Sequence, residues 1–81
     1  MSTETRKTIE AKIRLLEAAA TRAGAAVTDA NARLAVAEAA GDEEGAKDAR
    51  ADRKLARLNF ESAAAALTKA RFMLHLTSVE G

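Results

Sequence analysis

Cysteine, proline, tryptophan and tyrosine are absent from the sequence, which also contains only four glycines and two phenylalanines. The lack of cysteine excludes a disulfide framework, a zinc–thiolate site and a thiol nucleophile. His75 is the only histidine, so a metal site with several histidine ligands is excluded as well. The lack of proline removes the strongest helix breaker. We therefore expect an all-α protein without a metal centre or a cofactor.

Long apolar runs and a large net charge are missing too. No apolar stretch approaches the roughly 20 residues that span a bilayer, and the first residues lack the apolar core of a secretory signal. We expect a soluble, cytoplasmic protein that does not bind membranes. Thirteen basic and twelve acidic side chains give a net charge of +1, which argues against a strongly electrostatic nucleic-acid binder.

Alanine dominates the apolar part of the composition. Apolar residues make up 48% of the 81-residue chain, but 22 of them are alanine and only 17 are larger. A chain of this length forms one domain, and because alanine buries little area, a single hairpin would have a thin core. We therefore expect association with a second copy or with another partner. The alanine and arginine bias also suits a GC-rich bacterial or phage genome.

One segment interrupts the helix-favouring composition, the Gly-Asp-Glu-Glu-Gly run at 41–45. Gly41 suits the left-handed position after a helix end, and Asp42 suits the N-cap of the next helix. Glu43 and Glu44 would then lie in the first turn, where the helix dipole favours negative charge. The chain 1–81 is therefore predicted to be a single helical-hairpin domain, with helices over about 3–40 and about 43–78 and the turn at 41–45.

Both predicted helices carry an apolar heptad stripe whose spacing alternates between three and four residues. The stripe of the first helix comprises Ile9, Ile13, Leu16, Ala20, Ala23, Val27, Ala30, Leu34 and Ala37. The stripe of the second helix comprises Ala46, Ala49, Arg53, Ala56, Phe60, Ala63, Leu67, Ala70, Leu74 and Thr77. Folding the chain at the turn often sets a large side chain against a small one, which is typical of two closely packed helices. The pattern predicts an antiparallel coiled-coil hairpin.

The positions beside the stripes support this register, because opposite charges face each other there. The expected contacts are Glu17–Arg71, Glu38–Arg50, Arg33–Asp52 and Asn31–Arg57, with Gly24 close to Ala64. In a competing register these matches are lost, and the first helix packs instead on the face that carries Leu55, Leu58, Phe72 and Leu76.

Arg53 is the one charged residue in the stripe of the second helix, where it lies opposite Leu34. We expect its stem to pack between the helices while its head group reaches out along Asp52 or Glu38. A buried polar contact that fixes the register is the alternative.

A second apolar stripe lies on the opposite face of the second helix, which a two-helix hairpin cannot bury. It comprises Ala51, Leu55, Leu58, Ser62, Ala65, Phe72, Leu76 and Val79, interrupted by Lys69. The first helix has a weaker equivalent in Ala11, Leu15, Ala18, Ala25, Ala32, Val36 and Ala39. An exposed patch of this size marks an interaction surface. The candidate interface residues are Leu55, Leu58, Ala65, Lys69, Phe72 and Leu76.

Two occupants of this surface are open at this point. The first is a second copy of the chain, most simply in a dimeric four-helix assembly. The second is a different protein that docks helix on helix or helix in groove.

Residues suited to catalysis are few. His75 has no serine, cysteine or carboxylate at a spacing typical of a triad, which favours a solvated surface histidine. The acidic residues at 42–44 lack the alternating spacing of a calcium loop, which favours helix capping over cation binding. A two-helix rod offers no deep pocket for acid–base chemistry. The sequence thus predicts that the protein is not an enzyme.

The interpretation we favour is a non-enzymatic protein–protein interaction module, a small inhibitor, adaptor or regulator of the kind that phages and mobile elements encode. It would act through the outer apolar face of the second helix. One alternative is a structural assembly component, such as a virion or secretion-apparatus subunit. The other is a nucleic-acid-binding helical dimer with Lys47, Arg50, Lys54 and Arg57 as contacts, although no tyrosine or tryptophan is available to stack on bases.

Overall fold

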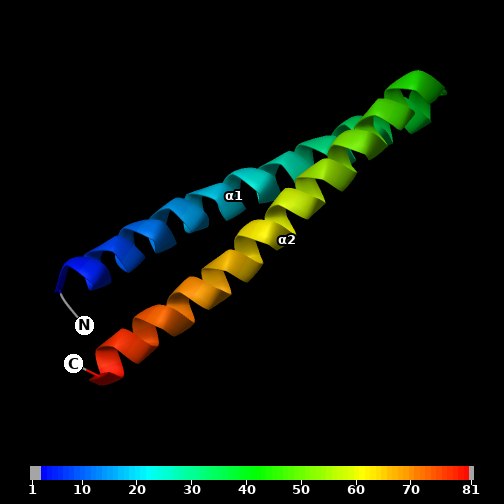
Figure 1. The fold of residues 1–81 in the computed structure, drawn as a ribbon. Helices are drawn as coiled ribbons and strands as arrows, with labels where there is room; N and C mark the ends of the chain where they lie inside the picture. Colours follow the sequence, from blue (N-terminus) through cyan, green and yellow to red (C-terminus); the bar gives the residue numbers. More distant parts are fainter. Residues whose placement is uncertain (1–2, 81) are drawn as a thin grey trace.

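The computed structural model describes residues 3–80, and the side chains of residues 5–77. Helix α1 spans Thr3–Ala40 and helix α2 spans Glu43–Glu80, two residues beyond its predicted end. The two helices pack against each other as a hairpin of 59 × 14 × 12 Å, with the turn at one end and both termini at the other (Figure 1). The predicted all-α hairpin is therefore confirmed. Val79, the last residue of the predicted outer stripe, lies outside the described side chains.

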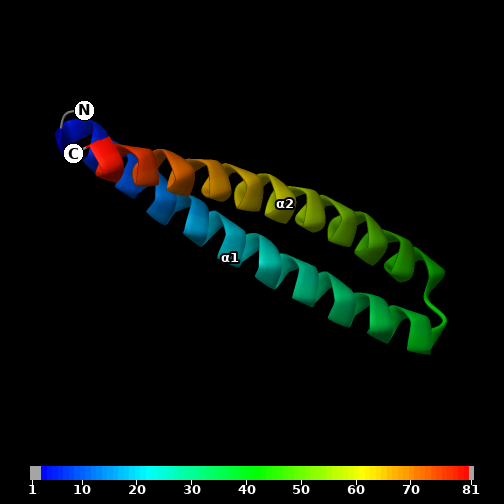
Figure 2. The same ribbon diagram turned by 90° about the horizontal axis from the view of Figure 1, so that it is seen from below.

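The helices wind about each other along the hairpin. They overlap near the turn in Figure 1 and near the termini in Figure 2, which is turned by 90°. The plane that contains both helix axes therefore rotates from one end of the molecule to the other.

The end of α1 is closed by backbone hydrogen bonds. Gly41 has a φ of 70°, the left-handed conformation that glycine adopts without a steric penalty. The Gly41 N–H donates to the Glu38 carbonyl at 3.2 Å, and the Asp42 N–H donates to the Ala37 carbonyl at 2.8 Å. This pair of bonds is a Schellman C-cap, so the predicted role of Gly41 is confirmed.

The start of α2 follows immediately, because Asp42 is also its N-cap. The Asp42 carboxylate accepts a hydrogen bond from the Gly45 N–H at 3.0 Å, and its carbonyl accepts one from the Ala46 N–H at 3.0 Å. Glu43 and Glu44 occupy the first turn of the helix, as predicted. A connection of only two residues therefore closes one helix and opens the next.

The two predicted heptad stripes form the interface between α1 and α2. All residues of the α1 stripe, and all but Phe60 of the α2 stripe, are buried or half-buried. Among the described side chains, Leu34 is the only buried apolar one larger than alanine. Close to the turn it packs in one cluster with Ala37, Ala46 and Ala49. The core is thin because alanine fills most of it, as the composition led us to expect.

Phe60 departs from the predicted packing and is 42% exposed. A Cβ atom placed on Gly24 would lie 3.8 Å from two carbons of the Phe60 ring, while no atom of Ala64 lies within 4 Å of it. The prediction that Gly24 lies close to Ala64 is therefore wrong. The alanines at 56 and 63 hold the helices together on either side of Phe60, so the large ring moves to the side where Gly24 leaves room.

Contacts beside the stripes fix the register. Three of the four predicted pairs are present: Glu17–Arg71 at 3.2 Å, Glu38–Arg50 at 3.6 Å and Arg33–Asp52 at 2.9 Å. They join residues 12 to 54 positions apart in the chain, and they are incompatible with the competing register. In agreement with this, Leu55, Leu58, Phe72 and Leu76 are exposed.

The fourth predicted pair is wrong. Asn31 accepts a hydrogen bond from Arg53 at 3.3 Å, and not from Arg57. Arg53 is half-buried, so its stem packs between the helices as expected. Its head group turns to Asn31 rather than to Asp52 or Glu38, because Asp52 is bound by Arg33 and Glu38 by Arg50.

Candidate protein-interaction surface

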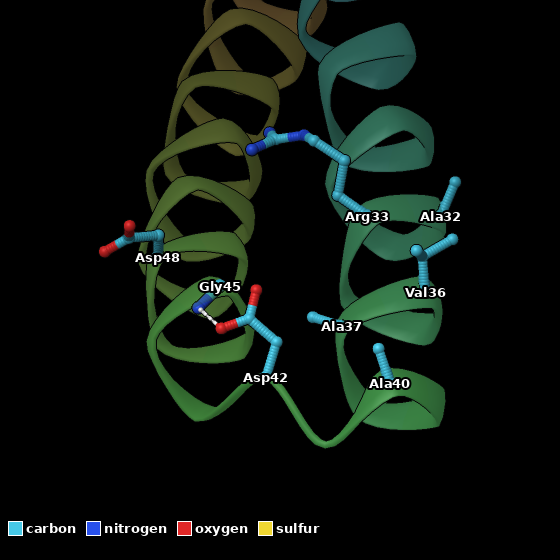
Figure 3. A pocket seen from close by; sticks show the side chains of 8 residues that line it. All are labelled: Ala32, Arg33, Val36, Ala37, Ala40, Asp42, Gly45 and Asp48. Atoms are coloured by element: carbon cyan, nitrogen blue, oxygen red, sulfur yellow. Dashed lines mark hydrogen bonds between the residues drawn. The ribbon is translucent and has the colours of Figure 1, made fainter.

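A row of three hollows follows the side of the hairpin that carries the Arg33–Asp52 bridge, from the turn toward the termini. Figure 3 shows the hollow beside the turn, where Arg33 extends from α1 toward α2. Small side chains beside the interface leave the space between the helices unfilled. These are Ala40 at the turn, Ala26 in the centre and Ala66 near the termini.

Large apolar side chains border this row. Val36 lines the hollow at the turn, Leu55 the central one and Met73 the one near the termini. Leu15 and Leu76 fall on the same side, because each lies three heptads from Val36 or Leu55 on its own helix. We call this side the apolar flank and define it by these five residues, whose exposed fractions range from 40% to 72%.

The outer edge of α2 is a second apolar surface, turned away from α1. Leu58, Ala65 and Phe72 recur there at intervals of seven residues, and Leu58 and Phe72 are 53% and 60% exposed. All six predicted interface residues are thus exposed, but they divide between two surfaces. Leu55 and Leu76 belong to the apolar flank, Lys69 lines the hollow that this flank borders near the termini, and the other three belong to the outer edge.

The candidate list from the sequence omitted the two most exposed large apolar residues. These are Leu15 and Val36 of α1, which are 72% and 71% exposed. The sequence pattern places both of them only in the weaker apolar stripe of the first helix. Met73 was missed entirely because it lies beside the interface stripe rather than opposite it. Met73 could have been identified from its position beside the heptad stripe, because an apolar residue there occupies a position that is usually charged in coiled coils.

Charged side chains on the apolar flank are distributed unevenly. Toward the turn, Arg33 bridges Asp29 and Asp52, each at 2.9 Å, and hydrogen bonds to Asp52 and then Asp29 raise the pKa of the Arg33 guanidinium. Two carboxylates against one cation leave this cluster negative. Near the termini, Lys12 and Lys69 line the third hollow. The flank is therefore acidic toward the turn and basic toward the termini.

The opposite side of the hairpin is polar, and we call it the glutamate flank after Glu17 and Glu38, which pair there with Arg71 and Arg50. The four candidate nucleic-acid contacts all lie on it. Lys47 and Arg50 line a hollow beside the turn, and Lys54 and Arg57 follow one heptad later. Arg50 is occupied by Glu38. Thr68 and His75 are exposed on the same flank, two and three heptads after Lys54.

Metal-binding clusters and membrane-spanning helices are absent from the part of the chain that the structure describes. Within residues 3–80, no group of three or more histidine, cysteine or acidic side chains is placed to hold a metal ion. No helix in the same range is long and apolar enough to cross a membrane.

Known proteins do not extend this picture. The chain matches no family model, no curated protein and no solved structure.

Proposed function

We propose that this chain is a non-enzymatic protein-interaction module, a small cytoplasmic inhibitor, adaptor or regulator that binds another protein through the outer edge of α2. The observation that supports this most is the exposure of Leu58 and Phe72 on that edge. Burying a side chain of either kind contributes about 1.5–3 kcal/mol. A partner that covers both therefore gains substantial free energy without any change in the hairpin.

The shape of the edge favours a helical partner. Leu58 and Phe72 are two heptads apart, and Ala65 lies midway between them, so the edge is a ridge with a low centre. A helix that crosses this ridge can place its own large side chain over Ala65. We infer a partner helix with an apolar stripe rather than an extended peptide, since α2 offers no unpaired backbone groups for strand addition.

Two finer features belong to the same proposal. The buried heptad stripes and the pairs beside them support an antiparallel coiled coil between α1 and α2. The exposed apolar flank supports association of two hairpins into a four-helix assembly. A subunit of a larger structure would show the same surfaces, but its assemblies would grow with concentration, whereas a closed dimer would not.

A pair of double variants tests the role of the outer edge. Leu58→Asp with Phe72→Asp places two charges on it, and Thr68→Asp with His75→Asp adds two aspartates to the glutamate flank of the same helix. We expect both variants to keep the helicity of the parent in circular dichroism. Only the first should lose the protein that the parent chain retains from a lysate of its source organism.

Two outcomes would contradict the proposal. Equal retention of the same protein by both variants would exclude the outer edge as the binding surface. A collapse of helicity in the edge variant alone would mean that Leu58 and Phe72 belong to the hairpin core.

Nucleic-acid binding is the second candidate, favoured by Lys47 and Arg57, which line hollows on one flank, and by Lys54, which lies one heptad after Lys47. Binding of generic duplex DNA or RNA with a steep salt dependence would support it. Substitution of all three by glutamine should then abolish binding. The protein-partner proposal expects no such binding at physiological salt.

A further inference from the structure

The surface area of the hairpin is larger than its mass requires. The chain of 8.5 kDa exposes 5838 Å², whereas a compact monomer of that mass exposes about 4,700 Å². The excess is roughly 1,100 Å², and a stable interface buries about 800 Å² on each partner. The excess exposed area of one hairpin is therefore similar to the area that one stable interface buries on it.

We infer that a second copy of this chain covers the apolar flank, with the hairpins pointing in opposite directions so that the turn of one lies near the termini of the other. This deepens the proposed function, because it names the occupant of one apolar surface and leaves the outer edge of α2 for another protein. The order of side chains along each helix of the flank points to this arrangement.

On α1 the flank is arranged symmetrically about a point between residues 25 and 26. Leu15 and Val36 are equally far from that point, and so are Arg22 and Asp29. A twofold axis through it stacks α1 on α1 of the second copy in the opposite direction. Leu15 then meets Val36 of the second copy, and Arg22 meets its Asp29. The two most exposed apolar residues of the helix thus cover each other.

On α2 the central part of the flank is symmetric about a point between residues 60 and 61, whereas Met73 and Leu76 then face Asp48 and Gly45 of the second copy. Lys69 and Asp52 are equally far from it, and so are Leu55 and Ala66. Each lysine therefore meets an aspartate, and each leucine meets the small side chain that borders a hollow. The two points lie side by side in the hairpin. Residues that face each other across α1 and α2, such as Arg33 and Asp52, have residue numbers with a nearly constant sum, and the two points have that sum as well.

The charges agree with this direction and not with the reverse. Within the described side chains, neither Arg22 nor Lys69 forms an ion pair in its own hairpin. Opposed hairpins bring Arg22 beside Asp29 and Lys69 beside Asp52 of the second copy, the two carboxylates that share the single cation Arg33 in that copy. If the two turns instead lay side by side, α1 would face α2 of the second copy, and residues equally far from the turns would meet. Lys69 would then gain no acidic neighbour.

The arrangement has a consequence for the proposed function. The axis stacks α1 on α1 and α2 on α2, so the two outer edges lie on the same side of the assembly. Leu58 and Phe72 of both copies then form one continuous surface, which is long enough for a partner helix to cross two parallel ridges.

Single cysteines test the arrangement directly, because the chain contains none. A mass-tagged Leu15→Cys chain is mixed with an untagged Val36→Cys chain and oxidised mildly. We expect a disulfide between the two chains, and none when either variant is oxidised alone, since residues 15 of the two copies are about 32 Å apart. Ala35→Cys is the matched control, because it neighbours Val36 but lies on the glutamate flank, and it should not link to Leu15→Cys.

Light scattering and a charge variant complete the test. The parent chain should have twice the 8.5 kDa monomer mass, and Lys69→Glu should raise the dissociation constant of the dimer about fivefold by repulsion from Asp52 of the second copy. Lys54→Glu on the glutamate flank should leave it unchanged. A monomer at all concentrations would overturn the inference.

Linking of Leu15→Cys to Met73→Cys of another chain, without linking to Val36→Cys, would also overturn it, since that pair meets only when the turns lie together. Neither result would bear on the proposed role of the outer edge, because that role is tested separately by the Leu58→Asp and Phe72→Asp double variant.

Discussion

The Asp42 carboxylate occupies the space into which a side chain at Gly45 would project. A Cβ atom placed on Gly45 would overlap a carboxylate oxygen and lie 2.9 Å from the Asp42 Cγ. The same carboxylate accepts the Gly45 N–H at 3.0 Å. Glycine is therefore required here for the space it leaves and not for its backbone freedom, since only Gly41 has a positive φ among residues 3–80.

This contact predicts that Gly45→Ala and Asp42→Ala are not additive. Asp42→Ala should cost about 1 kcal/mol of unfolding free energy through loss of the N-cap. Gly45→Ala should bring no gain in the parent, because the new methyl group displaces the cap. In the Asp42→Ala background the same substitution should stabilise by about 0.5 kcal/mol through helix propensity. Urea unfolding of the four proteins at one concentration measures the coupling, and additivity within 0.3 kcal/mol would disprove the contact.

Gly24→Ala should stabilise the hairpin by about 0.5–1 kcal/mol, because a mid-helix glycine is costly and its Cβ would find room. The nearest atoms are the two Phe60 ring carbons at 3.8 Å, an ordinary contact distance. An increase in the melting temperature is the expected result. Destabilisation would show that the helices approach more closely at residue 24 than this geometry allows.

Leu34→Ala should be the most damaging truncation in the interface, at about 2–3 kcal/mol. Leu34 is 7% exposed and packs among alanines, which cannot move in to fill the cavity. Leu15→Ala is the control in the same helix, since Leu15 is 72% exposed in the hairpin. Thermal unfolding at a concentration low enough to keep the proposed dimer dissociated should show a large decrease in melting temperature for Leu34→Ala and almost none for Leu15→Ala.

Arg53→Leu should raise the stability of the hairpin by about 1 kcal/mol. Leucine would add apolar area opposite Leu34, while the hydrogen bond to Asn31 that it removes is long, at 3.3 Å, and exposed. Asn31→Ala should have an effect below 0.5 kcal/mol by the same reasoning. A loss of stability in Arg53→Leu, measured by chemical unfolding, would mean that the arginine fixes the register of the two helices.

Local physical chemistry made much of the fold predictable. The turn followed from Gly41 and Asp42, whose conformational preferences act within a few residues. The interface followed from the heptad spacing, and the register followed from charges that face each other across it. The failures concern contacts in which neighbours compete. Arg53 turned to Asn31 because Asp52 and Glu38 already had partners, and the Phe60 ring moved over Gly24 because alanines hold the helices close.

The sequence by itself determined the two helices, their pairing and the surplus of exposed apolar residues, since each depends on spacing along a single helix. Only the tertiary structure decided that this surplus forms two surfaces rather than one. Leu55 and Leu58 are three residues apart in one apparent stripe, but α1 lies beside one of them and not the other. A flank shared by both helices exists only after they have packed, because two of its five residues, Leu15 and Val36, come from α1 and the other three come from α2.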